Sequence, residues 1–334
     1  MKILINCSLP FSLAHGGQAI QIQQTMTALQ ALGLPVEPMR WWDESQTGDL
    51  IHYFGRMSDE QIRFAHQKKI KVVMAELLTA QGSRSLGRLR LQKLISRTMA
   101  TLAPRSFTAA FNWDSYHLAD AFIALTSWEK QIMEFMFDAD PARIFVVPNG
   151  VEQVFFTSPP SARGPWLVCT ATITERKRVL ELAQAAVAAE TPVWIIGRAY
   201  ADNHPYAQKF YQLAKQNPKF IRYEGAISDR TRLAAIYRAA QGFVLLSTME
   251  SLSLSALEAA ACECPLLLSD LPSARSSFAR GTQFCPVTDS VPVTAKALRL
   301  FYDAAPNLLR PPKPATWPDV AQQLLAVYQK VMAA

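Results

Sequence analysis

The sequence predicts an α/β protein built from two doubly wound domains, each with a buried parallel sheet. Short β-rich runs alternate with helical patterns along most of the chain, and strands separated by helices form right-handed βαβ units. This alternation occurs twice, on either side of residues 148–165, where proline, serine and glycine crowd as in a linker. A length of 334 residues suits two domains that each bury a core of their own.

The first run of elements defines a domain over residues 1–155. Helical patterns cover Gln18–Leu32 and Trp128–Phe137, and they lie between apolar runs. The strands that we expect in this domain are Ile3–Asn6, Leu50–Phe54, Val72–Ala75, Ala121–Leu125 and Ile144–Val147.

The second run defines a domain over residues 156–334. We expect a helix at Val179–Ala189 and an apolar helix, Val320–Ala333, after Pro318. The expected strands are Trp166–Thr170, Val193–Ile196, Ile221–Glu224, Phe243–Leu246 and Leu266–Ser269. Ligands of such domains bind beside the carboxyl ends of parallel strands, so we expect a ligand site in a cleft between the two domains.

Bulk properties narrow the class of protein. The amino terminus, MKILINCSLP, has no signal-peptide layout, and no uncharged apolar run approaches the ~20 residues that span a bilayer, so we expect a soluble cytoplasmic protein. Five scattered cysteines without a zinc spacing indicate buried thiols in a reducing compartment. The net charge of +7 favours an anionic partner: nucleic acid, a membrane surface or a phosphorylated substrate.

The most informative stretch is Glu250-Ser-Leu-Ser-Leu-Ser-Ala-Leu-Glu258, which follows the apolar strand GFVLL. Helix propensity rises from about Leu254, and a helix that begins there directs N–H groups and a positive dipole end at the loop. That arrangement suits a diphosphate, with Glu250 before the helix and Glu258 one turn inside it. The alternative is that Glu258 is a solvated helix residue and Ser253 a plain N-cap.

Two further loops carry weaker signals. Thr174-Glu-Arg-Lys-Arg178 opens a helix with three adjacent cations, which opposes the helix dipole and indicates a nearby anion; a solvated turn is the alternative. His15-Gly16-Gly17-Gln18 separates the first strand from the first helix, and paired glycines allow close backbone approach to a phosphate or sugar. The segment lacks GxGxxG, which disfavours a dinucleotide site.

Taken together, these motifs resemble the retaining glycosyltransferases of family four, which have the two-Rossmann B-type fold. The resemblance covers nearly the whole chain. It rests on the Glu250-x7-Glu258 spacing, on Val146-Val-Pro-Asn-Gly-Val-Glu152 as the interdomain signature, on Gly16-Gly17, on Asp49-Leu-Ile-His52, and on a terminal helix, residues 317–334, that packs back toward the first domain.

The resemblance implies a role for each matching residue. Glu250 would contact the donor sugar, Glu258 the ribose hydroxyls, and Lys177 the departing diphosphate. Gly16 and Gly17 would close over the donor, and Gly225 and Ile227 would lie near the base. Glu250, Lys177 and Arg176 are the expected catalytic residues. Further donor contacts are implied for Arg178, Ser253, Leu254 and Ser255. No metal or other cofactor is expected.

The chain also departs from the family pattern. Ala171 stands where an arginine is usual, so Arg176 or Arg178 is expected to replace it, and Ser253 replaces a glycine. Glu76 aligns with an acceptor-side histidine. His52 and His117 are weaker candidates for acceptor contacts, with structural roles as their alternatives.

We therefore predict transfer of a hexosyl group from a nucleoside-diphosphate sugar, with retention, to a sugar, lipid or protein acceptor. Two alternatives stay open: a degenerate nucleotide-sugar-binding protein without transfer activity, and a nucleotide-sugar epimerase of the same architecture. Nucleic acid is the least favoured partner because no nucleic-acid-binding motif is present.

A basic segment suggests a peripheral position at the inner face of a membrane. Residues 61–105 contain ten Lys or Arg and one acid, Glu76. Within it, Arg90, Lys93 and Arg97 fall on one side of a predicted helix, and Leu91, Leu94, Ile95, Met99 and Leu102 fall on the other. The alternative is an ordinary domain helix with its apolar side in the core and its basic side in water.

Overall fold

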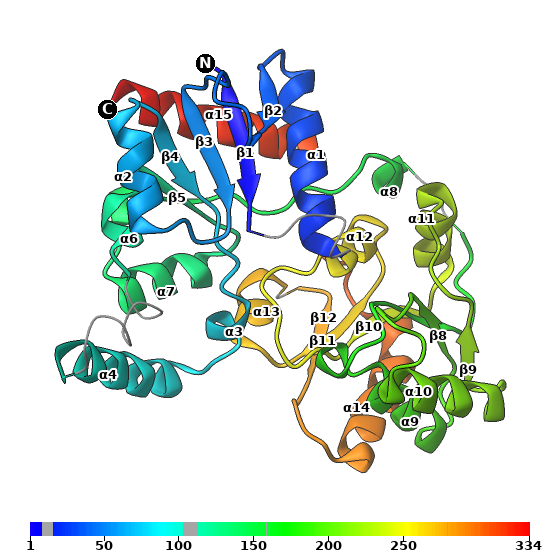
Figure 1. The fold of residues 1–334 in the computed structure, drawn as a ribbon. Helices are drawn as coiled ribbons and strands as arrows, with labels where there is room; N and C mark the ends of the chain where they lie inside the picture. Colours follow the sequence, from blue (N-terminus) through cyan, green and yellow to red (C-terminus); the bar gives the residue numbers. More distant parts are fainter. Residues whose placement is uncertain (9–15, 103–112, 158, 160, 279) are drawn as a thin grey trace. The chain divides into compact units, whose positions relative to one another are not determined.

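A computed structural model describes residues 1–8, 16–102, 113–157, 159, 161–278 and 280–334. The chain divides into two compact units, drawn in Figure 1. Unit 1 comprises Met1–Asn149 and Trp317–Ala334, and unit 2 comprises Gly150–Thr316. Each unit has one six-stranded sheet whose described pairings are all parallel, so the predicted doubly wound α/β class is confirmed.

The sheet of unit 1 has the order β2-β1-β3-β4-β5-β6. Its strands are β1 (Ile3–Cys7), β2 (Val36–Pro38), β3 (Leu50–Phe54), β4 (Lys71–Met74), β5 (Ala121–Ala124) and β6 (Ile144–Val146). All five residues of β3 are buried, because helices cover both faces of a parallel sheet. Strand β2 was not predicted, because this three-residue edge strand contains Glu37, ends in Pro38 and therefore lacks an apolar run.

Helices surround this sheet, and the chain end contributes one of them. They are α1 (Gly17–Ala31), α2 (Asp59–Gln67), α3 (Thr79–Gly82), α4 (Leu86–Leu102), α6 (Ser115–Leu118), α7 (Ser127–Phe137) and α15 (Trp317–Ala333), with a 3-10 turn, η2, at Pro141–Arg143. The terminal helix α15 packs beside α1 (Figure 1) and buries a stripe that includes Val320, Leu324 and Tyr328. None of the described helices is long and apolar enough to cross a membrane.

The sheet of unit 2 has the order β12-β11-β10-β7-β8-β9. Its strands are β7 (Leu167–Thr170), β8 (Val193–Ile196), β9 (Ile221–Tyr223), β10 (Gly242–Leu245), β11 (Leu266–Ser269) and β12 (Thr282–Cys285). Successive strands run outward from β7 to one edge and from β10 to the other. The strand order therefore reverses between β7 and β10, and such a switch point is where open α/β sheets bind ligands.

The helices of unit 2 follow the same alternation. They are α8 (Val154–Thr157), α9 (Val179–Ala188), α10 (Pro205–Gln216), α11 (Arg230–Ala239), α12 (Leu254–Ala261), α13 (Pro272–Ser277) and α14 (Val291–Ala304), with 3-10 turns η3 (Glu175–Lys177) and η4 (Ala305–Asn307). Strand β12 was not predicted, because its first three residues are only half-buried and its sequence, TQFC, lacks an apolar run.

The division between the units falls at Asn149 and Gly150, six residues before the boundary expected from the sequence. Local contacts explain the difference. Val151 forms a bridge with Thr316, and the side chain of Phe155 is fully buried where α8 packs against α11 and α12. The residues from Gly150 to Thr157 therefore belong to unit 2. Residues 317–334, by contrast, belong to unit 1.

Candidate active site

The loop between β10 and α12 ends in an N-capped helix. Ser253 is the N-cap of α12, and its hydroxyl accepts a hydrogen bond from the Ala256 amide at 3.4 Å. The helix begins at Leu254, as the sequence predicted. The amides of Leu254 and Ser255 thus lie in the first turn, where the helix N-terminus carries a partial positive charge. This end of α12 follows β10, one of the two strands at the switch point.

The basic turn after β7 meets this loop at the other side of the switch point. Thr174 caps η3 by accepting a hydrogen bond from the Lys177 amide at 3.3 Å. The Thr248 amide donates to the Arg176 carbonyl at 2.8 Å, and Arg176 Nη1 donates to the Met249 carbonyl at 2.9 Å. Backbone bonds thereby fix the cationic turn against the loop that carries Glu250.

Three of the predicted site residues come together here. Lys177 Nζ forms an ion pair with Glu250 Oε1, and Arg176 Nη1 lies 3.5 Å from the same oxygen. The sequence predicted an anion near these cations, and a protein carboxylate already occupies that position. Two cations against one carboxylate leave the cluster with one net positive charge, which still favours an anionic ligand.

Arg178 has a different environment from its two neighbours. Its backbone is left-handed, with φ 53°, and its side chain is only 6% exposed. The guanidinium donates to the Thr288 carbonyl and lies 4.0 Å from Asp289. Of the two arginines that could replace the family arginine at Ala171, only Arg176 therefore lies beside Glu250.

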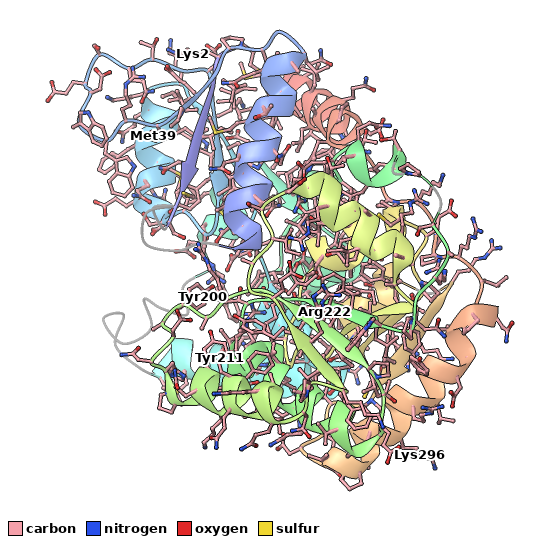
Figure 2. All side chains as sticks on the ribbon, turned by 90° about the vertical axis from the view of Figure 1, so that its right-hand side faces the viewer. Lys2, Met39, Tyr200, Tyr211, Arg222 and Lys296 are labelled. Atoms are coloured by element: carbon pink, nitrogen blue, oxygen red, sulfur yellow. The ribbon has the colours of Figure 1, made fainter. Side chains whose placement is uncertain are left out.

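Two cavities of unit 2 lie outside this cluster. One, of about 680 Å³, is next to the basic turn and is lined by Arg178, Thr248 and the start of α10 at His204. The other, of about 710 Å³, follows the edge strand β9 and is lined by Tyr211 and Arg222, which Figure 2 labels.

Glu258 lies one turn inside α12 and is 6% exposed, so the alternative of a solvated helix residue is wrong. Its Oε1 accepts a hydrogen bond from Arg230 Nη2 at 2.5 Å, and its Oε2 accepts one from the Tyr237 hydroxyl at 3.3 Å. Burial raises the pKa of Glu258, and the nearby Arg230 charge opposes that shift.

Neither partner of Glu258 was predicted from the sequence. Arg230 and Tyr237 both belong to α11, seven residues apart, so they share one face of that helix. This spacing is visible in the sequence. What the sequence does not reveal is that this face packs against α12.

Glycines bring the ends of three strands close together. Gly225, which follows β9, has φ 81°, and its carbonyl accepts a hydrogen bond from the Gly197 amide at 2.8 Å. A Cβ on Gly197, which follows β8, would lie 1.9 Å from the Ala171 carbonyl oxygen after β7. Ile227 is half-buried two residues beyond Gly225. Gly197 was missed, although a glycine directly after a predicted strand is a recognisable signal.

Gly16 and Gly17 lie at the start of α1 in unit 1. Gly16 is the N-cap of the helix, with φ 147°, and because glycine has no side chain it provides no side-chain cap. Gly17 is the exposed first residue of the helix. His15, with the rest of its loop, lies outside the described residues. The helix N-terminus again follows a strand of the sheet, as the sequence predicted.

The three acceptor-side candidates are placed differently. Glu76 follows β4, where Arg56 binds it at 2.8 and 2.9 Å and the Tyr116 hydroxyl donates to it at 2.6 Å. His117 is exposed on α6, which leads into the amino end of β5 rather than to a carboxyl strand end. Arg56, which follows β3, is a further polar residue of this edge that was not predicted.

His52 is a core residue, and its assignment as an acceptor contact is corrected. The side chain is 1% exposed, and its Nδ1 lies 2.6 Å from the Tyr328 hydroxyl of α15. Burial lowers the pKa of His52 to about 3, so the ring is neutral at physiological pH. A buried neutral ring that joins β3 to α15 has a structural role.

Helix α4 presents its apolar side outward, which overturns the interpretation as an ordinary amphipathic scaffold helix. The exposed fractions of Leu91, Leu94, Ile95, Met99 and Leu102 lie between 45% and 79%. On the other side, Lys93 and Arg97 bind the Asp138 carboxylate at 2.7 and 2.9 Å. The helix is thus attached to unit 1 through its charged side and through the buried Leu89.

Comparison with known proteins agrees with this architecture. Residues 164–303 match the family model described as Glycosyl transferases group 1. No curated protein matches the sequence.

Several solved structures match the whole chain. Sucrose-phosphate synthase from Thermosynechococcus elongatus has a TM-score of 0.71 at 16% identity, with 100% of both chains covered. A glycosyltransferase from Rickettsia africae has a TM-score of 0.67 at 12% identity, covering 99% of this chain and 98% of its own. Anabaena HepE, solved with UDP and glucose, has a TM-score of 0.62 at 14% identity, with coverages of 98% and 99%. The chain thus has the B-type glycosyltransferase fold, and its segment 164–303 is similar to the group 1 glycosyl transferases.

Proposed function

We propose that this protein is a glycosyltransferase that moves a hexosyl group from a nucleoside-diphosphate sugar to an acceptor, with retention at the anomeric carbon. The observation that carries the proposal is the convergence of Lys177 and Arg176 on Glu250 at the start of α12, inside the segment that matches the group 1 model. Cations beside a helix N-terminus suit a diphosphate, and an adjacent carboxylate suits sugar hydroxyls.

In this proposal the site works mainly on the leaving group. The diphosphate gains negative charge as the glycosidic bond breaks, and Lys177, with the amides of Leu254 and Ser255, stabilises that charge more in the transition state than in the ground state. The ion pair with Glu250 keeps Lys177 in place before the donor arrives. The acceptor attacks from the leaving-group side, so the protein needs no nucleophile of its own.

The other candidate residues complete the donor site. Glu258 would bind the ribose hydroxyls, and the strand ends at Gly225 and Ile227 would lie beside the base. Gly16 and Gly17 at the start of α1 would supply donor contacts from unit 1, and Glu76 would serve the acceptor side. HepE, which shares the fold, was solved with UDP and glucose, so UDP-glucose is the first donor to test.

The test is release of nucleoside diphosphate from a panel of UDP-, GDP-, ADP- and dTDP-hexoses, measured by mass spectrometry. Lys177→Ala should lower the rate of release roughly 10²-fold, since it removes one stabiliser of the leaving group. Lys296, exposed on α14 and labelled in Figure 2, provides the control, and Lys296→Ala should retain the wild-type rate. Equal loss in both variants, or release of nucleoside diphosphate from none of the donors, would refute the proposed activity.

One observation favours a second candidate, a nucleotide-sugar-binding protein without transfer. Both oxygens of Glu258 already accept hydrogen bonds from Arg230 and Tyr237, so this carboxylate is less available to a ribose. The two candidates differ in turnover. A binding protein would raise its thermal midpoint with a nucleoside diphosphate but release none from any donor, even with acceptors added.

We also propose that α4 docks this protein on an anionic membrane surface. Leu91, Leu94 and Ile95 form an exposed apolar stripe, with the exposed Arg88 on the same side and the exposed Arg90 at the border with the charged side of the helix. An apolar face bordered by arginines matches a bilayer interface with anionic headgroups. Each buried CH₂ contributes about 0.8 kcal/mol, and each basic residue near the surface adds about 1 kcal/mol.

The measurement is cosedimentation with vesicles of neutral or anionic lipids at low and high salt. We expect stronger recovery with anionic vesicles and a decrease with salt, because the headgroup attraction is screened. Leu94→Ser with Ile95→Ser should abolish recovery, whereas Phe64→Ser, at an exposed apolar side chain of α2, should not. Equal recovery with neutral and anionic vesicles would contradict the proposed partner.

A further inference from the structure

The chain passes between the two units twice, and the two passages are paired. They lie at Asn149–Gly150 and at Thr316–Trp317. Just inside unit 2, the Val151 amide donates to the Ala315 carbonyl at 2.9 Å, and Val151 forms a parallel bridge with Thr316. The two connecting segments, residues 150–152 and 314–316, are therefore hydrogen-bonded to each other.

One guanidinium links these connecting segments to the candidate donor site. Arg230 Nε donates to Glu152 Oε2 at 2.7 Å, and Arg230 Nη2 lies 2.5 Å from both Glu152 Oε2 and Glu258 Oε1. The guanidinium also lies over the Phe155 ring, with 4.7 Å from Cζ to the ring centroid. Arg230 thus links the carboxylate of Glu152, which follows Val151, to the carboxylate of Glu258 in α12.

Glu152 and Glu258 share the Arg230 guanidinium, so a change in the charge of one carboxylate changes how strongly Arg230 binds the other. Glu258 is buried, and its charge depends on Arg230 for compensation, while the proximity of Glu152 further raises the pKa of Glu258. A planar guanidinium offers donors in fixed directions, so its position between the two carboxylates is a compromise, and a weaker attraction to Glu258 lets it bind Glu152 more closely.

We propose that Arg230 is a positioning residue that couples the state of Glu258 to the paired connecting segments. This rests on the proposed function, in which a ribose binds Glu258. Ribose hydroxyls that donate to Glu258 satisfy part of its charge, and Arg230 then binds Glu152 more strongly. The segment beside Glu152 becomes more ordered, so donor binding is transmitted to the place where the chain passes between the units.

Hydrogen exchange without any ligand tests the coupling directly. The reporters are the Val151 amide and the amides of 155–157, which donate within the same stretch. Glu258→Gln removes the negative charge that competes with Glu152 for Arg230, so Arg230 should bind Glu152 more strongly. Hydrogen exchange at these amides should therefore slow about threefold or more. In the Arg230→Lys background, Glu258→Gln should leave exchange unchanged, because a lysine lacks the fork that joins the carboxylates.

A matched control lies two residues away on the same helix. Arg232 pairs with Glu224 at the surface and takes no part in this network. Glu258→Gln in an Arg232→Lys background should slow exchange as in the wild type. If Glu258→Gln slows exchange equally in the Arg230→Lys and Arg232→Lys backgrounds, the coupling is refuted. The coupling is also refuted if Glu258→Gln has no effect in the wild type. Arg230→Lys keeps the charge, and its thermal midpoint confirms that the variant is folded.

A second arm uses UDP, with GDP and ADP as alternatives, and separates this inference from the proposed function. UDP should slow exchange at Val151 in the wild type, and Glu152→Gln should remove that response, although Glu152 lies outside the proposed ribose contact. UDP binding without any change at Val151 would refute the coupling and leave the donor assignment intact. If no nucleoside diphosphate binds, but Glu258→Gln slows exchange only when Arg230 is present, the coupling stands and the donor assignment falls.

Discussion

At the scale of single residues, Glu250 and Glu258, eight positions apart in the sequence, have opposite environments. Glu250 lies partly exposed among cations at a loop, whereas Glu258 is buried in a network with Arg230 and Tyr237. The same spacing in the sequence therefore produces one residue suited to contact a substrate and one suited to hold a ligand group at a fixed position. Their substitutions should have different effects.

We expect Glu258→Ala to weaken nucleoside diphosphate binding by roughly 1–3 kcal/mol, as on loss of a buried hydrogen-bonding partner. Glu250→Ala should retain binding of the free nucleoside diphosphate and lower turnover, because its proposed partner is the sugar. Calorimetry with UDP, together with the release assay, distinguishes the two. Unchanged binding by Glu258→Ala would contradict the ribose assignment.

The buried His52 should make unit 1 sensitive to acid. Its folded pKa is about 3, below the ordinary 6.5, so between these values only the unfolded state binds the proton. Stability is fully present above pH 6.5 and is lost as pH falls. At 1.36 kcal/mol per pH unit, about 2 kcal/mol is lost between pH 6.5 and 5.

Urea unfolding at pH 5 and 7 measures this contribution. His52→Gln should reduce the difference in stability between the two pH values, and His117→Gln, at an exposed histidine, should leave it as in the wild type. The same difference in all three proteins would mean that His52 is not the acid-sensitive group.

At the scale of elements, the candidate site depends on loops that meet at the carboxyl ends of β7, β8, β9 and β10. Gly197 makes this possible, since its amide binds Gly225 and its Cα lies against the Ala171 carbonyl. We expect Gly197→Ala to destabilise unit 2 by more than about 3 kcal/mol, because a Cβ has no room and φ is 152°.

Gly33→Ala is the comparison for this prediction. Gly33 also has positive φ, 79°, but a Cβ there would meet nothing within 4 Å. Its substitution should therefore introduce backbone strain alone, of about 1–2 kcal/mol. Thermal unfolding of the two variants, followed by circular dichroism, decides the matter, and equal losses would show that close approach at Gly197 is unimportant.

At the scale of the whole molecule, the first unit is assembled from both ends of the chain. Helix α15 buries Val320, Leu324, Val327, Tyr328 and Val331 in unit 1. Because a buried apolar side chain contributes about 1.5–3 kcal/mol, a chain that stops at Thr316 should lose the unfolding transition of unit 1. A chain that stops at Val331 removes only exposed residues and should keep it.

Scanning calorimetry of the two truncated chains tests this dependence. Unit 2 comprises Gly150–Thr316 without a break, so its own transition should persist in both. Two intact transitions in the shorter chain would show that α15 contributes little to unit 1.

Much of the fold follows from local sequence patterns. Runs such as Leu50–Phe54 and Val193–Ile196 are apolar throughout because both faces of a parallel sheet are buried, and the structure has these strands at the predicted bounds. The start of α12 at Leu254 follows from the N-cap at Ser253. The short edge strands β2 and β12 were not predicted, because only about half of their residues are apolar.

Other features were decided by tertiary structure, for one physical reason. Local patterns fix which residues share a face of an element, but not which neighbour that face meets. The sequence by itself therefore determined the doubly wound class, whereas the strand order that brings Lys177, Arg176 and Glu250 together was visible only in the structure. Only the tertiary structure placed Arg230 between Glu152 and Glu258 and buried His52 in the core. It likewise decided that the apolar side of α4 is exposed, because Lys93 and Arg97 on the other side bind Asp138.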